Sequence, residues 1–185
     1  MDADAAAADP LPQTALAGPG PIDAGAQAAV SELYRSNALG LMRLAHIMLG
    51  SRELAEDVVQ DAFCGLYRRW GQLNDPAKAL GYVRSSVLNG CRSALRRRGR
   101  PEALGPPPEP AASAEAAALT EHKRREVIGA LRQLPARQRE ALVLRYYLSL
   151  SPAEIALVMG IGEGSVRSAT HRGLAALGRI LGEDA

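Results

Sequence analysis

The fold is decided by residues 151–181, SPAEIALVMGIGEGSVRSATHRGLAALGRIL. At the start of this stretch, Ser151 and Glu154 have the spacing of a capping box, in which each side chain accepts a hydrogen bond from the other residue's backbone amide. Pro152 falls at the first helical position, where its missing N–H costs no hydrogen bond. Glycines at 160 and 162 then predict a tight turn. The stretch therefore predicts a short helix, a turn and a longer helix, which is the layout of a helix-turn-helix.

The longer helix, from about Glu163 to Leu181, has two unlike faces. At about 100° per residue, small or apolar residues gather on the side of Val166, namely Ala169, Thr170, Gly173, Leu174, Leu177, Ile180 and Leu181. The other face carries Arg167, Ser168, His171, Arg172, Ala175 and Arg179. A recognition helix needs this division, because one face packs on the core while the other enters the major groove of DNA. A solvated surface helix would carry the same charges, but the capped helix and the turn before it favour DNA binding.

The rest of the chain also predicts helices, because apolar residues recur at three- and four-residue steps. Three helices are expected over about 28–49, 52–70 and 79–98, with a loop at 71–77. Gly50 and Ser51 predict the end of the first helix and the cap of the second. A fourth helix, from about residue 120, has one apolar face made of Val127, Ile128, Leu131 and Leu134. No segment alternates with the period of a strand, so the predicted fold class is all-α.

The helices group into two small domains, residues 28–100 and residues 120–182. Residues 1–27 form an acidic tail that is expected to be disordered, because they are mostly Ala, Pro, Gly and Asp. Residues 101–119, PEALGPPPEPAASAEAAAL, are read as a flexible acidic linker. Three successive prolines at 106–108 forbid a helix at that point.

Charge is distributed in blocks, although the formal net charge of the 185-residue chain is only +2. The stretches 27–100 and 122–182 are both basic, and the stretch between them, 101–121, carries acids and no bases. Two basic blocks separated by an acidic one indicate two modules that face nucleic acid.

Composition and motifs exclude several other classes of protein. The aromatic content of 4% is too low for a sheet that stacks single-stranded RNA bases. No apolar run reaches the length of a membrane span, and the acidic N-terminus does not resemble a signal peptide. The two cysteines, Cys64 and Cys91, lack metal-ligand spacing. Without a phosphate loop, a nucleophile elbow or a metal cluster, neither enzymatic activity nor a cofactor is expected.

Two motifs resemble those of the sigma-70 family of bacterial RNA polymerase sigma factors. Residues 54–63, LAEDVVQDAF, are similar to the signature of region two of that family. Residues 137–146, RQREALVLRY, and residues 151–172 are similar to its region four. Two regions joined by a short linker resemble the extracytoplasmic-function class. The resemblance covers roughly residues 28–98 and 120–181.

The resemblance implies a cytoplasmic factor that binds core RNA polymerase, brings it to promoter DNA and helps to open the duplex. The implied contacts are with the clamp of the largest subunit and the flap of the second largest, and an anti-sigma factor is a possible further partner. The acidic linker would thread channels of the polymerase or serve only as a spacer. The alternative is a helix-turn-helix regulator that acts without polymerase, which leaves the motif at 54–63 unexplained.

The family pattern assigns site residues by position. Binding to core polymerase falls to Asp57, Gln60 and Asp61, whereas Phe63 and Trp70 are read as core. Binding to the minus-10 element falls to Asn74, Asp75, Tyr82, Arg84, Asn89, Arg92, Arg96 and Arg97. Binding to the minus-35 element falls to Arg167, Ser168, His171 and Arg172.

Several of these assignments have a structural alternative. Asn74 and Asp75 are also ordinary turn residues, and Asn89 is as easily a structural hydrogen-bonding residue. Tyr82 stands where many members of the family carry Trp, and a tyrosine ring can stack on a base. A histidine such as His171 commonly caps or packs rather than contacts DNA.

Overall fold

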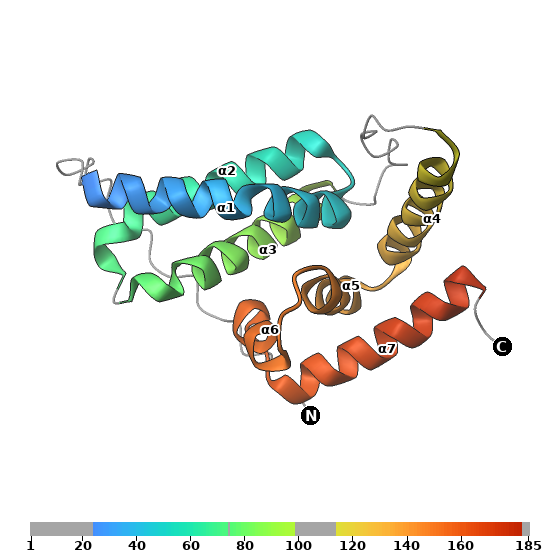
Figure 1. The fold of residues 1–185 in the computed structure, drawn as a ribbon. Helices are drawn as coiled ribbons and strands as arrows, with labels where there is room; N and C mark the ends of the chain where they lie inside the picture. Colours follow the sequence, from blue (N-terminus) through green and yellow to red (C-terminus); the bar gives the residue numbers. More distant parts are fainter. Residues whose placement is uncertain (1–23, 74, 99–113, 183–185) are drawn as a thin grey trace, which may run out of the picture.

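The structure, a computed structural model, describes residues 24–73, 75–98 and 114–182. Every regular element within these ranges is a helix (Figure 1), so the all-α prediction is confirmed. The α helices are α1 (Ala24–Leu49), α2 (Arg52–Arg69), α3 (Ala79–Arg98), α4 (Ala114–Gln133), α5 (Ala136–Leu142), α6 (Pro152–Met159) and α7 (Glu163–Leu181). Short 3-10 turns at Trp70–Gln72 and Pro76–Lys78 join α2 to α3, and a π-helical turn at Val143–Tyr147 follows α5.

The N-terminal half consists of α1, α2 and α3, which pack side by side (Figure 1). Gly50 ends α1 with a φ of 73°, a left-handed conformation that glycine adopts without strain. The hydroxyl of Ser51 then caps α2 by accepting a hydrogen bond from the amide of Leu54 at 3.3 Å. These two residues therefore end one helix and start the next, as predicted.

The C-terminal half consists of α4 to α7 and contains the predicted helix-turn-helix as α6 and α7. Both hydrogen bonds of the capping box are present: the Ser151 amide donates to Glu154 Oε2 at 2.8 Å, and the Glu154 amide donates to Ser151 Oγ at 3.3 Å. Gly160 ends α6 with a φ of 67°. Gly173 on α7 is buried, and a Cβ added there would lie 3.1 Å from the side chain of Leu142. The missing side chain thus lets α7 approach α5 closely.

Two helices begin earlier than predicted. α1 starts at Ala24 rather than near residue 28, and α4 starts at Ala114, inside the segment read as linker. The alanine-rich residues 114–119 have high intrinsic helix propensity, and the prolines that argue against a helix all lie before them. The rest of the predicted tail and linker, residues 1–23 and 99–113, lies outside the described residues.

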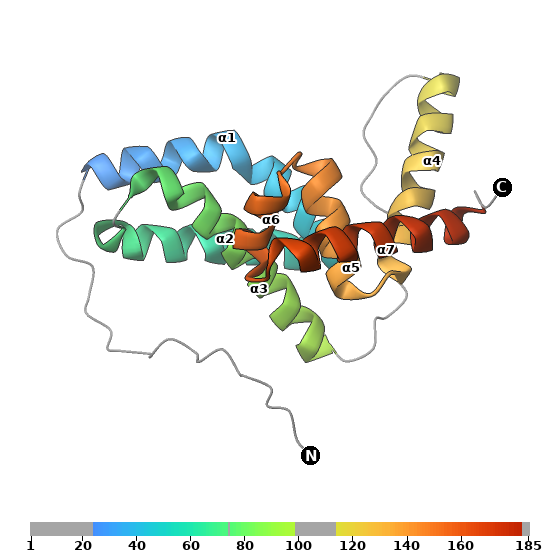
Figure 2. The ribbon, with the colours of Figure 1, turned by 90° about the horizontal axis from the view of Figure 1, so that it is seen from below.

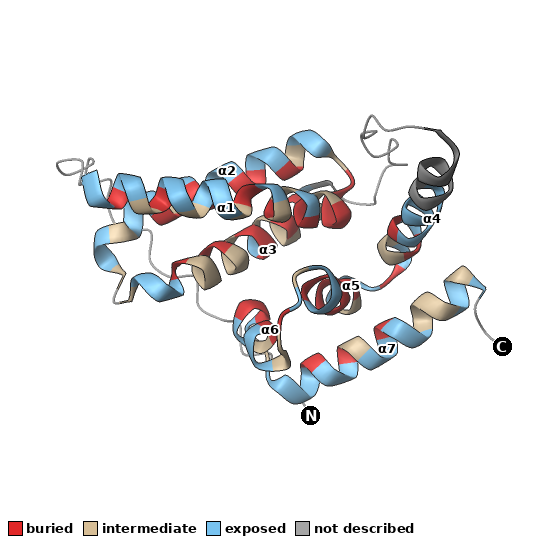
Figure 3. Ribbon diagram, viewed as in Figure 1, coloured by how far each residue is buried: buried red, intermediate tan, exposed pale blue. Residues whose placement is uncertain are grey.

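Three apolar side chains that were predicted to face the core are more than one third exposed: Val127, Leu174 and Ile180. An amphipathic face is buried only where another helix covers it. In Figure 1 the C-terminal turns of α7 extend past α5, and Figure 3 shows mainly exposed and half-buried residues there. Helical periodicity correctly predicted which face of each helix is apolar. It did not predict how much of that face another helix covers.

The two halves pack against each other, with α3 against α6 (Figure 2) and α1 against α4. Most of their buried apolar residues belong to one continuous cluster. Polar contacts cross the same boundary, because the Arg132 guanidinium of α4 donates to the backbone carbonyls of His46 at 3.2 Å and Ile47 at 3.4 Å on α1. This boundary positions several of the predicted site residues.

Candidate nucleic-acid interface

The outer face of α7 is the most open of the predicted surfaces. Arg167, Ser168, His171 and Arg172 are all exposed there, while Val166, Ala169 and Gly173 on the opposite face are buried. Arg167 forms an ion pair with Glu163 one turn before it, at 3.0 Å. Such an exposed pair contributes little stability, so the guanidinium can turn to another acceptor at small cost. The structure therefore places the four predicted minus-35 residues on one accessible face.

The predicted minus-10 residues of α3 lie in more varied surroundings. Arg96 and Arg97 at the C-terminal end of the helix are exposed, and Arg96 donates to Ser93 Oγ at 2.8 Å. Tyr82 is half-buried, and its hydroxyl accepts a hydrogen bond from Arg69 at 3.5 Å. Tyr82 and Arg97 share a hollow of about 220 Å³ between α2 and α3 with Asp61, one of the predicted polymerase contacts.

Arg92 is engaged across the boundary between the two halves. Its guanidinium donates to both carboxylate oxygens of Glu140 on α5, at 2.9 Å and 2.6 Å, and to Asn89 Oδ1 at 3.1 Å. The bonds to Glu140 raise the pKa of Arg92. The side chain of Glu140 is 1% exposed, and a carboxylate buried so far requires a paired cation. In this arrangement, Arg92 and Asn89 take part in a contact within the chain.

Arg84 also faces the C-terminal half. Burial lowers the pKa of this half-buried guanidinium, and the carboxylate of Glu154 on α6 partly offsets the effect. The pKa of Glu154 is lowered in turn, mainly by its two hydrogen bonds with Ser151 and to a smaller extent by Arg84. The cap of the helix-turn-helix and a predicted minus-10 arginine therefore lie close together.

In the loop before α3, Asp75 acts as a turn residue, which is the structural alternative to a contact with DNA. Asp75 caps the 3-10 turn by accepting a hydrogen bond from the Ala77 amide at 2.9 Å, and Lys78 Nζ lies 3.9 Å from its other oxygen. Asn74 lies outside the described residues. A contact of this loop with a DNA base stays a prediction.

The predicted polymerase contacts lie together on α2. Asp57, Gln60 and Asp61 are all exposed, whereas Phe63 is buried and Trp70 is half-buried against the core. Gln60 borders α1, and Asp61 borders α3. The structure thus presents one polar flank of α2 and confirms the inward position of the two aromatic residues.

Sequence reasoning missed the polar residues at the boundary between the halves. Glu140 and Arg139 are the buried charged residues among those described, and Arg139 donates to the carbonyl of Arg132 at 3.1 Å. One signal was available, because Arg139 and Glu140 stand three residues before Leu142 and Val143, so each charged residue shares a helix face with an apolar one. His46 of α1 lies at the same boundary, and burial followed by the charge of Arg132 lowers its pKa.

Among the described residues, no three His, Cys, Asp or Glu side chains gather in a way that suits a metal ion. None of the described helices combines the length and the apolar character that crossing a bilayer requires.

Comparison with known proteins gives matches over both halves of the chain. The model described as "Sigma-70 region 2" matches residues 33–101, and the model described as "Sigma-70, region 4" matches residues 124–177. The RNA polymerase sigma factor CarQ of Myxococcus xanthus is 31% identical over 161 residues, which cover 86% of this chain and 92% of CarQ. The ECF RNA polymerase sigma factor SigM of Mycobacterium tuberculosis is 32% identical over 164 residues, which cover 86% of this chain and 80% of SigM.

Solved structures share the fold. The sigma factor RpoE in complex with the anti-sigma factor NepR from Bartonella quintana gives a TM-score of 0.65 at 22% identity, covering 84% of this chain and 99% of that one. CnrH in complex with the cytosolic domain of CnrY gives a TM-score of 0.64 at 24% identity, covering 86% and 96%. The chain belongs to the sigma-70 family and, within that family, to the extracytoplasmic-function class.

Proposed function

We propose that this chain binds core RNA polymerase, directs it to promoters with minus-10 and minus-35 elements, and so initiates transcription in the cytoplasm. The observation that supports this most strongly is the order of the two matched regions, region two on α1 to α3 and region four on α4 to α7. The chain acts as an initiation factor and carries out no chemical step of its own.

The outer face of α7 is proposed to read the minus-35 element in the major groove. Arg167 or Arg172 would donate two hydrogen bonds to the O6 and N7 atoms of one guanine, which is worth about 1–3 kcal/mol of discrimination. Ser168 and His171 lie on the same exposed face and would contact phosphate or base. This face is accessible without any rearrangement of the chain.

The surface of α3 and its preceding loop is proposed to bind the minus-10 element. Arg96 and Arg97 are exposed and would contact phosphates, which position the protein rather than specify sequence. Tyr82 would stack on a base at the melted edge, next to the loop of Asn74 and Asp75. Arg84 and Arg92 would take part only after α3 separates from α5 and α6, whereas Asn89 is exposed and would be released from its hydrogen bond to Arg92 at the same time. We therefore propose that the two halves part when the factor binds polymerase and promoter.

The polar flank of α2 is proposed to bind the clamp of the largest polymerase subunit through Asp57, Gln60 and Asp61. All three side chains are exposed on one side of the helix, while the opposite side is buried. The C-terminal half would contact the flap of the second largest subunit. An anti-sigma factor that covers these surfaces is a further proposed partner, supported by the two solved relatives of the same fold, one of which is bound to a named anti-sigma factor.

Run-off transcription tests the proposal. Core polymerase from the source bacterium would be incubated with genomic fragments, with and without the full chain. We expect specific transcripts only when the chain is present, and their start sites would define both promoter elements. Specific binding of duplex DNA by the chain alone, without any transcript, would favour the regulator that acts without polymerase.

A further inference from the structure

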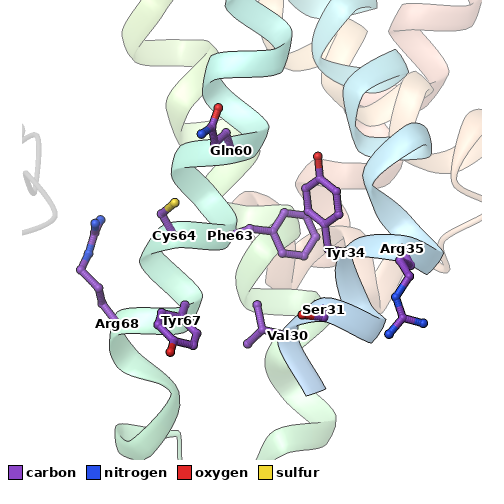
Figure 4. Close-up of a pocket in the computed structure, with 9 residues that line it drawn as sticks. All are labelled: Val30, Ser31, Tyr34, Arg35, Gln60, Phe63, Cys64, Tyr67 and Arg68. Atoms are coloured by element: carbon purple, nitrogen blue, oxygen red, sulfur yellow. The ribbon is translucent and has the colours of Figure 1, made fainter. Parts of the chain in front are cut away.

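A groove between α1 and α2 has no role in the contacts described so far. It encloses about 460 Å³ and lies directly beside the polar flank of α2 (Figure 4). Phe63 is buried beneath it, and the ring of Tyr34 packs edge-on against Phe63 at a centroid distance of 5.0 Å. Tyr34 is 44% exposed and Tyr67 is 36% exposed. The groove therefore offers an apolar floor, open to solvent, on which another segment can pack.

Cations flank the aromatic groove. Arg35 of α1 and Arg68 of α2 both line it. Arg35 forms an exposed ion pair with Glu32, whereas Arg68 has no carboxylate partner among the described residues. The groove therefore combines an apolar floor with a net positive border, which suits a segment that carries both apolar and acidic residues.

We propose that this groove is the docking site of the chain's own N-terminal segment, residues 1–23. That segment carries four aspartates and no lysine or arginine, so its charge is complementary to the border of the groove. Leu11 and Leu16 supply apolar side chains for the floor. The N-terminal segment therefore carries both the acidic and the apolar residues that suit the groove, and it is covalently attached beside it.

The length of the segment and the place where it ends also fit. The segment joins α1 at Ala24, and Val30, which lines the groove, follows six residues later, or about 9 Å along a helix. Fully extended, the 23 residues span up to about 76 Å, so the segment is long enough to reach the groove. Residues 18–21, Gly-Pro-Gly-Pro, have the composition of a turn that reverses the chain. Because the segment is tethered, its effective concentration is on the order of millimolar, and weak contacts suffice for docking.

Docking would have a consequence for the proposed function. Gln60 lines the same groove, so a docked segment would cover one side of the flank proposed to bind polymerase. The acidic segment would then compete with core polymerase. This consequence rests on the proposed function, whereas docking itself does not and is tested separately.

A thiol in the groove provides the test. Cys64 lines the groove and is exposed, whereas Cys91 is buried and its surroundings raise the pKa of its thiol to about 12. The rate of Cys64 alkylation by a maleimide, followed by mass spectrometry on the full chain, therefore reports how often the groove is covered. We expect the double variant Leu11→Asn, Leu16→Asn to react about fivefold faster than the parent, equivalent to about 1 kcal/mol.

A matched pair of arginine variants adds a second readout. Arg68→Gln removes the border cation and should also speed the reaction, whereas Arg43→Gln, an exposed residue of α1 outside the groove, should leave the rate unchanged. A faster reaction in Arg68→Gln together with an unchanged rate in Arg43→Gln indicates that the groove has been uncovered. Circular dichroism would verify that each variant remains helical.

Other occupants give other results, and each overturns the proposal. Equal rates in the parent and the leucine variant mean that the segment does not cover Cys64. Protection that grows with protein concentration assigns the groove to a second copy of the chain. Protection that requires core polymerase assigns it to the polymerase. If the segment docks but the leucine variant binds polymerase no more tightly than the parent, the proposed competition with polymerase is contradicted. The docking itself is still supported in that case.

Discussion

The exposed face of α7 and the surface of α3 carry similar side chains in very different surroundings. On α7, Arg167 and Arg172 are exposed, and Arg167 pairs only with Glu163 of its own helix. On α3, Arg84 and Arg92 are half-buried against α6 and α5. One proposed DNA-binding surface is therefore ready in the folded chain, while the other is partly occupied by the chain itself.

The difference has an electrostatic origin. Glu140 is almost fully buried, and Arg92 supplies the cation that a buried carboxylate requires. No residue of α7 meets a buried acid in this way among the contacts of the described residues. Interfaces within a chain commonly resemble transient protein interfaces, and this boundary combines a buried ion pair with apolar contacts. We expect it to open when polymerase and promoter bind.

Removal of Arg92 should have the largest effect. Arg92→Ala leaves Glu140 buried without its cation, and breaking a buried pair in this way costs about 3–5 kcal/mol. Because separation of the halves exposes Glu140 to water, the variant should shift toward an open arrangement. Small-angle X-ray scattering of the free chain should then give a larger radius of gyration.

Arg96→Ala on the same helix is the matched control, because Arg96 is exposed and its hydrogen bond among the described residues is to Ser93 of the same helix. An unchanged radius in Arg92→Ala would mean that other contacts hold the halves together and that the two surfaces differ less than proposed.

Removal of Arg167 should have a smaller and more specific effect. Arg167→Ala is expected to lose about 1–3 kcal/mol of discrimination at one minus-35 base pair, while binding to core polymerase survives. Run-off transcription on promoters with single substitutions in the minus-35 element measures this loss. Promoter preference identical to that of the parent would remove Arg167 from the reading face.

Charge reversal on α2 tests a third surface, the polar flank of α2. Its binding to polymerase should not depend on the outer face of α7 or on the surface of α3. Asp61→Arg should weaken binding to core polymerase by about 1 kcal/mol, because a charge at the rim of an interface acts mainly through long-range attraction. Competition binding with labelled core polymerase gives the affinity, and thermal unfolding verifies the fold. Full binding by a folded variant would contradict the assignment of this flank.

The smallest expected effect is a pH dependence of the boundary at His46. Burial and Arg132, with a further contribution from Arg124, lower its pKa in the packed arrangement from the ordinary 6.5. A histidine exposed by opening of α1 from α4 binds a proton more readily, so falling pH should favour the open arrangement once it passes below about 6.5.

The radius of gyration should therefore rise modestly between pH 7.5 and pH 5.5, and His46→Gln should remove much of that change. A pH response that persists undiminished in His46→Gln would assign the effect to another group.

Much of the molecule follows from local sequence. The capping box of Ser151 and Glu154, the turn at Gly160 and the stop at Gly50 depend on residues within one or two turns of each other, and all three lie where they were expected. The inward face of α2 follows from helical periodicity in the same way. The early start of α4 was not predicted, because the prolines earlier in the segment argue against a helix. The alanines that begin α4 favour one.

The helices, their caps, the polar face of α7 and the polar flank of α2 could all be predicted from the sequence, because these features depend on neighbours along one helix. The packing of the helices brings Arg92 to Glu140, 48 residues away, and Arg132 to His46, 86 residues away. It also makes α1 and α2 enclose an aromatic groove. Periodicity specifies which face of a helix is polar, but the packing of distant helices decides which polar groups remain open to a partner.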